Sequence, residues 1–132
     1  MNTSTVNLSP TEDTKTHVIS IYQDKGHYAC AQCSAVITLQ DELISKSFSG
    51  REGRGFLMHS AVNVKHGKKE DRPLLTGMHT VSDVFCVGCN DRLGWYYVKA
   101  SDTSQKYKEG KYLLERAKIV KDNVWRLDDD DF

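Results

Sequence analysis

Hydrophobic and polar side chains alternate along much of this chain, and the pattern predicts a protein built mainly from short β-strands. The clearest run spans residues 56–64, where Phe56, Met58, Ser60, Val62 and Val64 occupy alternate positions, the period of two that a strand shows. β-Prone residues also fill 80–85 and 95–99, and the first predicted strand covers 17–22. The pattern therefore predicts a mainly β fold.

Glycine, proline and charge mark the connections between these strands. A glycine-rich turn is predicted at 50–55, and a charged connector that ends on proline is predicted at 65–73. Only the segment 111–122 conflicts with the β pattern, because its residues are strong helix formers and propensity alone would make it a helix.

The length of 132 residues fits one domain of ordinary size. We expect a flexible tail at 1–16, a folded domain at 17–125 and a solvated acidic tail at 126–132, where like charges repel. No stretch approaches the ~20 apolar residues that cross a bilayer, and the first sixteen residues lack the apolar segment of a secretory signal. We therefore expect a reducing compartment, in which disulfides seldom persist.

The charges of the chain cancel, with eighteen Lys and Arg against eighteen Asp and Glu. A neutral protein does not capture nucleic acid or anionic membranes through net charge alone, so neither is an expected partner. A local basic group remains in the two predicted connections, and we predict that it contacts a protein partner. Its members are Arg51, Arg54, Lys65, Lys68 and Lys69. Interleaved acidic residues favour a solvated rim as the simpler interpretation.

The four cysteines form two C-x-x-C pairs, Cys30 with Cys33 and Cys86 with Cys89. Such spacing lets a tight turn aim two sulfurs at one metal ion, and four thiolates complete a closed tetrahedral zinc shell. Disulfides, a thioredoxin-type redox motif and an iron–sulfur cluster are the weaker alternatives. Fifty-two residues separate the two pairs, so we predict one structural zinc ion that joins distant parts of the chain.

Residues beyond the cysteines carry a family resemblance. Gly53 follows Cys33 after nineteen residues, and a Gly-Trp-Tyr-Tyr sequence at 94–97 follows Cys89 after four. The remaining matching positions are Leu57, Asn63, Gly77, Lys108 and Glu115, together with the local sequences at 41–46, 74–77 and 107–111. In these features the chain closely resembles the Yippee-like family across about residues 27–123.

The resemblance implies a β-tent fold, in which two antiparallel sheets lean together and a Cys₄ zinc site pins their apex. This fold is shared with the ligand-binding domain of cereblon, with Mis18 and with methionine sulfoxide reductase B. It implies that 111–122 is largely strand, against its helical propensity.

The resemblance to cereblon-type domains also raises the possibility of an aromatic pocket. Trp95 and Tyr97 stand at the offsets where those domains place two walls of a ligand cage, and alternate residues share one face of a strand. Met78 and His79 are added as neighbouring pocket candidates, whereas Leu75 and Val81 replace two further tryptophans of that pattern. Aromatic faces suit cations and flat polar rings. The competing interpretation is that Trp95 and Tyr97 are ordinary core residues.

The expected function is a non-catalytic protein-interaction module, because all four cysteines are assigned to the metal and no catalytic motif is legible. The resemblance implies a cytoplasmic and nuclear protein that serves as an accessory or regulatory subunit of a GID/CTLH-type ubiquitin ligase. The alternative is a domain that binds a small ligand or a modified residue at Trp95 and Tyr97. A nucleic-acid-binding zinc protein ranks below both.

Overall fold

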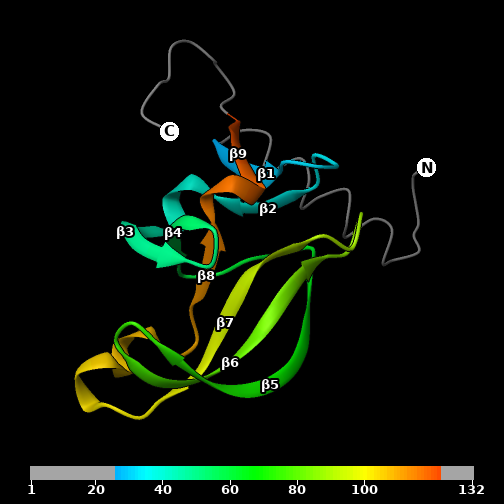
Figure 1. The fold of residues 1–132 in the computed structure, drawn as a ribbon. Coiled ribbons are helices and arrows are strands. Elements are labelled where there is room, and N and C mark those ends of the chain that lie inside the picture. Colours follow the sequence, from blue (N-terminus) through cyan, green and yellow to red (C-terminus); the bar gives the residue numbers. More distant parts are fainter. Residues whose placement is uncertain (1–25, 123–132) are drawn as a thin grey trace, which may run out of the picture.

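Nine antiparallel strands and three short 3₁₀ helices form the structure, a computed structural model that describes residues 26–122 (Figure 1). The strands are β1 His27–Cys30, β2 Val36–Leu39, β3 Leu43–Gly50, β4 Gly53–Met58, β5 Val64–Leu74, β6 Gly77–Cys86, β7 Arg92–Ala100, β8 Tyr112–Glu115 and β9 Ile119–Asp122. The 3₁₀ helices are η1 Gln40–Glu42, η2 Thr103–Lys108 and η3 Arg116–Lys118.

The strands form two sheets, which confirms the predicted mainly β class. One sheet has three strands in the order β2-β1-β9, and the other has six in the order β3-β4-β8-β7-β6-β5. Figure 1 shows the smaller sheet at one end of the molecule and β5–β7 at the other. The chain enters the small sheet, builds the large one and returns to the small sheet through β9, so segments far apart in sequence pair with one another.

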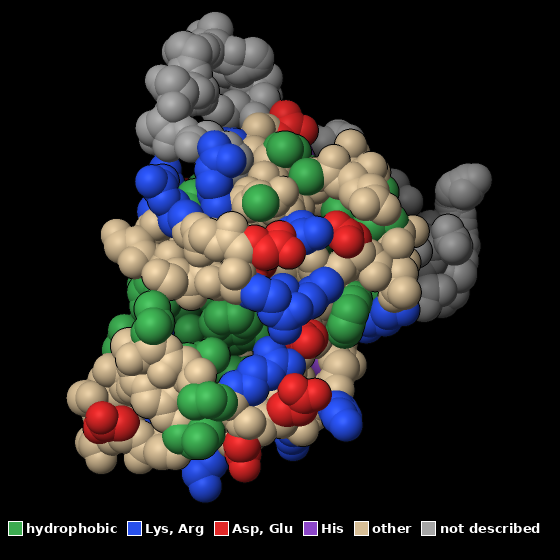
Figure 2. All heavy atoms as spheres, in the orientation of Figure 1, with side chains coloured by type: hydrophobic (Ala, Val, Ile, Leu, Met, Phe, Trp, Pro, Cys, Tyr) green, Lys and Arg blue, Asp and Glu red, His purple; other side chains and the backbone are tan. Residues whose placement is uncertain are grey.

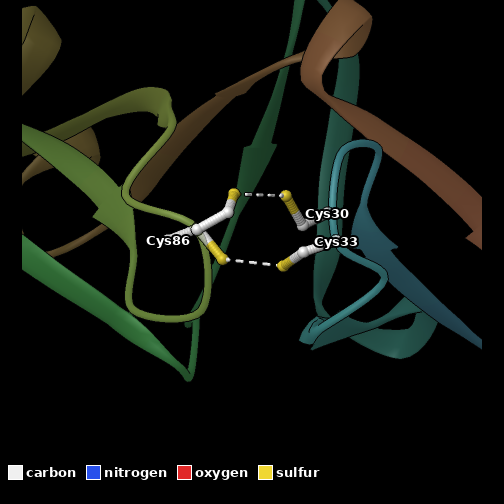
Figure 3. Close-up of side chains that lie close together, drawn as sticks. Cys30, Cys33 and Cys86 are labelled. Carbon is white, nitrogen blue, oxygen red and sulfur yellow. Dashed lines mark hydrogen bonds between the residues drawn. The ribbon is translucent and has the colours of Figure 1, made fainter.

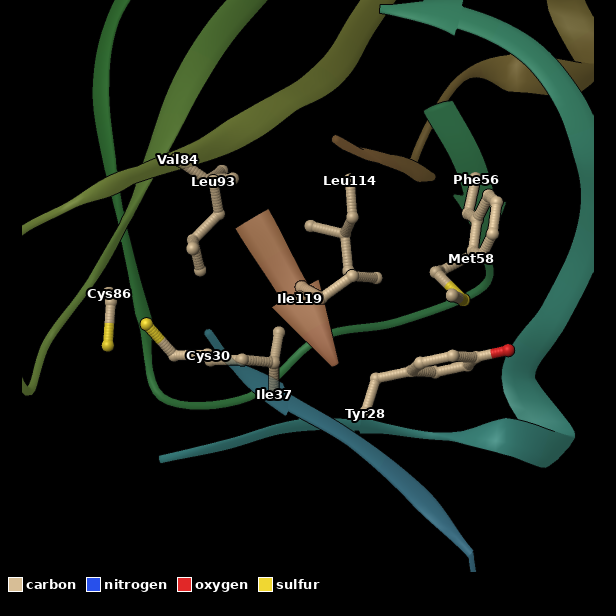
Figure 4. Packing of buried hydrophobic residues seen from close by; sticks show 10 residues of the cluster. All are labelled: Tyr28, Cys30, Ile37, Phe56, Met58, Val84, Cys86, Leu93, Leu114 and Ile119. Atoms are coloured by element: carbon tan, nitrogen blue, oxygen red, sulfur yellow. The ribbon is translucent and has the colours of Figure 1, made fainter. Parts of the chain in front are cut away.

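A first hydrophobic cluster fills the space between the two sheets. Tyr28, Ile37 and Ile119 enter it from the small sheet, and Phe56 and Leu114 enter it from the large sheet. Figure 4 shows that this cluster extends from the cysteines at one end to the aromatic pair of Tyr28 and Phe56 at the other, whose ring centroids are 6.0 Å apart. The cysteines thus lie at one edge of the hydrophobic core that joins the two sheets.

A second cluster lies on the opposite face of the large sheet. Leu57 and Leu113 alternate with Phe56 and Leu114 of the first cluster, as the period of two along a strand requires. Its members are Leu57, Val81, Trp95, Tyr97 and Leu113, with Phe48 and Leu74 packed against them. All come from the large sheet itself.

Gly94 is needed because β7 and β8 approach one another closely at this point. A Cβ atom built on Gly94 would lie 1.9 Å from the carbonyl oxygen of Leu113, a distance that no side chain tolerates. The glycine of the Gly-Trp-Tyr-Tyr sequence therefore allows the backbone contact that places Trp95 beside Leu113 on β8.

The structure confirms some predicted strands and corrects others. β6 and β7 contain the predicted strands 80–85 and 95–99. The predicted connector at 65–73 is wrong, because it lies within β5, an edge strand whose outer side needs no hydrophobic residues. The predicted strand at 56–64 is split, since β4 ends at Met58 and β5 begins at Val64.

The segment 111–122 follows the family resemblance and not its helical propensity. It contains β8, η3 and β9, because pairing with β4, β7 and β1 outweighs the intrinsic preference. The predicted strand at 17–22 and both predicted tails lie outside the described residues. Within 26–122, no helix is long and apolar enough to cross a membrane.

Candidate functional site

The two C-x-x-C pairs occupy two matching hairpin turns on different sheets. Cys30 ends β1 of the small sheet and Cys86 ends β6 of the large sheet, while Cys33 and Cys89 lie in the turns that follow. Figure 3 shows Cys30 and Cys33 pointing from one turn toward Cys86 of the other. The fifty-two residues between the pairs thus bridge the two sheets.

The backbones of the two turns adopt the same conformation. The N–H of Ser34 donates to the carbonyl of Cys30 at 2.8 Å, and the N–H of Asn90 donates to the carbonyl of Cys86 at 2.7 Å. Ser34 and Asn90 both have left-handed backbone torsions, with φ of 70° and 67°. Asn tolerates this region better than most residues, so the residue type at position 90 suits its turn, and Ser34 adopts the same backbone conformation at the equivalent position.

The sulfur atoms converge on one point, as a tetrahedral metal site requires. All four Sγ atoms lie within 4.8 Å of one another, and the nearest pairs are Cys30 with Cys89 at 3.6 Å and Cys33 with Cys86 at 3.5 Å. Zinc–sulfur bonds of about 2.3 Å place tetrahedral sulfurs about 3.8 Å apart, so this donor set fits zinc. Four thiolates leave no position for water, and the site is structural.

The four neighbouring sulfurs can be deprotonated together only when a cation lies between them. A backbone hydrogen bond at Asp91 lowers the pKa of the Cys89 thiol, but desolvation and the neighbouring thiols outweigh it and raise that pKa to about 12. Adjacent thiolates repel one another unless a positive charge lies between them. Zinc, once bound among Cys30, Cys33, Cys86 and Cys89, supplies that charge and holds the thiols deprotonated.

Two further residues position the zinc ligands and received no role from the sequence. Asn63 donates through its side chain to the carbonyl of Val36 at 2.7 Å and accepts at its own carbonyl from the N–H of Val87 at 2.9 Å. Gly88 leaves room for the sulfur of Cys33, which would lie 3.0 Å from an added Cβ. Asn63 belongs to the family pattern, and its left-handed φ of 60° is a second reason for this residue type.

A cavity of about 580 Å³ lies at the other end of the large sheet. Both edge strands of the sheet line it, β3 through residues 47–50 and β5 through residues 72–74. The sheet therefore curls until its two edges face one another. Figure 2 shows hydrophobic side chains gathered in a recess between the β3–β4 hairpin and the lower end of the large sheet.

Trp95 and Tyr97 both line this cavity and both belong to the second hydrophobic cluster. Their rings meet edge to face with centroids 6.2 Å apart, as expected for alternate residues on one strand face. Trp95 is 6% exposed and Tyr97 is 2% exposed. Both interpretations of Trp95 and Tyr97 therefore apply: each ring packs in the second hydrophobic cluster and also forms part of the cavity wall.

The other predicted pocket residues lie elsewhere. His79 is buried against the Tyr97 ring, with centroids 5.5 Å apart, and pairs its Nδ1 with the carbonyl of Gly77. Met78 is exposed on the β5–β6 hairpin. Neither lines the cavity, because the Met78 side chain is exposed to solvent and the His79 ring is covered by Tyr97, whereas Leu75 lines the cavity from the turn.

Lys108 is the cavity residue whose chemistry the sequence did not reveal. It is 3% exposed, and its Nζ donates to the hydroxyl of Thr76 at 2.9 Å. The same atom lies over three aromatic rings, at 5.0 Å from the centroid of Phe48, 5.5 Å from that of Tyr97 and 5.9 Å from that of Tyr107. Only its place in the family pattern distinguished this lysine in the sequence.

Buried Glu115 fixes the turn that forms one rim of the cavity. Its carboxylate accepts from the backbone N–H of Arg51 at 2.8 Å and of Glu52 at 3.2 Å, and it pairs with the guanidinium of Arg92 at 3.3 Å. A Cβ on Gly50 would lie 2.2 Å from this carboxylate. Gly50 and Glu115, of which Glu115 belongs to the family pattern, thus act together to shape this turn.

The predicted basic partner residues are all exposed but occupy two separate places. Arg51 and Arg54 lie on the β3–β4 hairpin, and Lys65, Lys68 and Lys69 lie on β5. Of these five, Arg51 alone lines the cavity.

Comparison with known proteins places these sites in a wider group. Residues 27–131 match a family model described as "Yippee zinc-binding/DNA-binding /Mis18, centromere assembly". A yippee-like protein of Arabidopsis thaliana is 56% identical over 96 residues, which cover 73% of this chain and 91% of the relative. Protein yippee-like 4 of Homo sapiens is 55% identical over 98 residues, with coverage of 74% and 77%.

A solved structure shares the fold at much lower sequence identity. The crystal structure of the Mis18 "Yippee-like" domain superimposes with a TM-score of 0.60 at 18% identity. The match covers 79% of this chain and 98% of that domain.

Proposed function

The chain belongs to the Yippee-like family, and from this premise we propose that it acts as a non-catalytic protein-interaction module built around a structural zinc ion. The observation that supports this proposal is the convergence of the four cysteines. They are the only cysteines of the chain, and all four sulfurs meet at one closed metal site. A thiolate bound to zinc in such a shell is not free to attack a substrate.

The proposal assigns recognition to the exposed parts of a rigid scaffold. Binding residues concentrate on loops and turns that a stable core holds in place. Arg51 and Arg54 project from a turn that buried Glu115 anchors, and Lys65, Lys68 and Lys69 are exposed on an edge strand. We propose these five residues as contacts with a protein partner.

We further propose that the partner is a GID/CTLH-type ubiquitin ligase and that the protein is one of its accessory subunits in the cytoplasm and nucleus. The support is analogy, because some members of the family associate with this ligase. Family analogy supplies a hypothesis about the partner and no atomic contact.

The direct test is binding of the full-length, zinc-loaded chain to purified ligase subunits, measured by biolayer interferometry. Replacement of Arg51 and Arg54 by Glu is expected to weaken binding by about tenfold or more, because each contact turns repulsive. Lys99→Glu is the control, since Lys99 is also exposed but lies outside the five residues. Equal affinities for all variants, or no binding of the wild type, would refute the proposed partner surface.

A second candidate function rests on the cavity at Trp95 and Tyr97. Its volume of about 580 Å³ is ordinary for a small-ligand site, and its walls combine aromatic rings with a few polar groups. We therefore also propose that this cavity binds a small ligand or a modified residue of a partner.

Nucleic-acid binding ranks below both candidates on electrostatic grounds. The net charge of the chain is zero, and Lys68 and Lys69 are followed directly by Glu70 and Asp71. A protein that binds phosphates through several basic contacts loses affinity steeply as salt rises. Nanomolar DNA binding at physiological salt would reverse this ranking.

A further inference from the structure

The aromatic rings of the cavity already surround a cation that belongs to the protein itself. The Nζ of Lys108 lies 5.0–5.9 Å from the ring centroids of Phe48, Tyr97 and Tyr107. At such distances the faces of aromatic rings attract a positive charge. A second cation, such as a methylated lysine, would meet both an occupied cage and electrostatic repulsion.

The Lys108 ammonium has few partners for a buried charge. Within the described residues it makes one hydrogen bond, to the Thr76 hydroxyl, although an ammonium group carries three donors. Among residues 26–122, no carboxylate forms an ion pair with it. Buried charges are normally paired, so this ammonium lacks the counter-ion that its burial calls for.

The remaining charged residues of the cavity wall have the same sign. Arg51 and Arg72 line the cavity with Lys108, and no aspartate or glutamate does. Arg72 is neutralised, because it pairs with Glu70 at 2.8 Å and with Asp83 at 2.9 Å. Arg51 is exposed, and its side chain forms no ion pair within the described residues.

From these contacts we propose that the cavity binds a carboxylate carried on an apolar body, with the carboxylate at Lys108 and the apolar body against Trp95 and Tyr97. The inference rests on the second function proposed above, a ligand site in this cavity, and specifies its ligand class. Two positive groups that lack partners fit a monoanion, whereas phosphate sites use more donors. The desolvated ammonium would bind the anion more strongly than an exposed lysine would.

The lowered pKa of Lys108 agrees with this assignment. Burial lowers the pKa of this ammonium, because desolvation disfavours its charged form. A bound carboxylate would offset the desolvation and raise the pKa again. Ligand binding and protonation of Lys108 are therefore coupled with a positive sign.

The test uses full-length, zinc-loaded protein and three probes with one carbon skeleton: 3-phenylpropionate, 3-phenylpropanamide and 3-phenylpropylamine. Binding is followed by ¹H–¹⁵N NMR, with the indole N–H of Trp95 as the reporter. The acid is expected to shift this signal and to bind at least about tenfold more tightly than the amide, the usual scale for a charged hydrogen bond. The amine is expected not to bind.

Two variants locate the charges that make the difference. Lys108→Met keeps the length of the side chain and is expected to lower the affinity for the acid by about tenfold or more. Arg51 is exposed, so Arg51→Gln should leave the fold intact. This variant is expected to lower the affinity for the acid by about threefold. Lys99→Gln is the matched control, because Lys99 is exposed but neither lines the cavity nor belongs to the proposed partner surface, and the affinity of this variant should not change.

Different outcomes separate this inference from the ligand site on which it rests. Equal binding of acid, amide and amine at Trp95 would overturn the charge assignment and leave the ligand site standing. Absence of binding by all three probes at 10 mM would overturn both. If Lys108→Met fails to fold, the probe series and the comparison of Arg51→Gln with Lys99→Gln still decide.

Two sources could provide such a carboxylate, a small organic acid or the C-terminus of a partner chain. The peptide Ala-Ala-Phe with a free carboxylate, compared with its C-terminal amide, distinguishes them. Tighter binding of the free peptide than of 3-phenylpropionate would assign the site to a chain terminus. Tighter binding of 3-phenylpropionate would assign it to a small acid.

Discussion

The two ends of the large sheet differ in whether their buried polar and charged groups have binding partners. β6 begins at Gly77, directly after the cavity residue Thr76, and ends at the zinc ligand Cys86, a distance of about 30 Å for ten residues. At the zinc end, four sulfurs converge on one metal site, and a backbone hydrogen bond within each turn pairs the N–H and carbonyl groups there. At the cavity end, Lys108 is buried among aromatic rings, and no carboxylate of the described residues forms an ion pair with it.

This difference indicates which end maintains the fold and which end is available for recognition. The zinc site joins the two sheets, so its binding energy is part of the folding energy. The cavity lies on the face of the large sheet that the small sheet does not cover. We therefore expect changes at the zinc end to unfold the protein and changes at the cavity end to alter binding first.

The largest effect is expected from loss of a zinc ligand. Cys30→Ser should lose zinc and leave the chain unfolded or molten, because binding energy on the order of 10 kcal/mol stabilises the fold. Zinc content by atomic emission and near-UV circular dichroism measure this effect. His59→Ser, at an exposed residue, is the control. A well-folded, metal-free protein with two disulfides would contradict the assignment.

A smaller effect is expected from truncation of the shared wall and core residue. Trp95→Ala should lower the free energy of unfolding by about 3 kcal/mol, the lower end for buried aromatic residues, because one side of the ring already faces the cavity. Urea unfolding monitored by circular dichroism measures the change.

Zinc content distinguishes Trp95→Ala from variants of the zinc ligands such as Cys30→Ser. Trp95→Ala should retain one zinc ion and lose binding of the acid probe. Leu114→Ala, in the cluster between the sheets, should lose similar stability but retain probe binding. Zinc loss in Trp95→Ala would show that the two ends of the sheet are not independent.

The next effect concerns the turn that Glu115 anchors. Glu115→Gln should cost about 2 kcal/mol, because a buried carboxylate that accepts from two backbone N–H groups and pairs with Arg92 is replaced by a neutral amide. Amide hydrogen exchange in the turn at 50–53 should accelerate. Glu52→Gln, on the exposed side of the same turn, should change stability by less than about 0.5 kcal/mol. Equal exchange in both variants would contradict this role.

The smallest effect is the pH dependence that Lys108 contributes. Because burial lowers its pKa in the folded state, the unfolded chain binds more protons between the two pKa values, and stability rises with pH toward the ordinary lysine value of about 10.4. Burial raises the pKa of Tyr97, which contributes with the opposite sign.

The comparison of wild type with Lys108→Met isolates the lysine contribution, since Tyr97 is common to both proteins. Urea unfolding between pH 8 and 10 should show the rise due to Lys108 in the wild type only. Binding of 3-phenylpropionate should weaken over the same range as the ammonium deprotonates. Parallel profiles for the two proteins would contradict the linkage.

The zinc site was predictable because its signal is local. Each C-x-x-C pair encodes one turn that aims two sulfurs, and that geometry does not depend on the rest of the fold. The alternation of side chains likewise predicted β6 and β7, since the period of two belongs to any half-buried strand. The edge strand β5 escaped prediction, because its exposed, charged residues look like those of a connector.

The sequence by itself determined the metal, its four ligands, the mainly β class and the family of this protein. Tertiary pairing overrode the helical propensity of 111–122, as the family resemblance implied, and tertiary structure alone decided that His79 packs against Tyr97 instead of lining the cavity. It also decided the environment of Lys108, whose neighbours Phe48 and Thr76 come from β3 and from the β5–β6 turn. No local pattern encodes that contact, because it forms only when the large sheet curls and brings its two edges together.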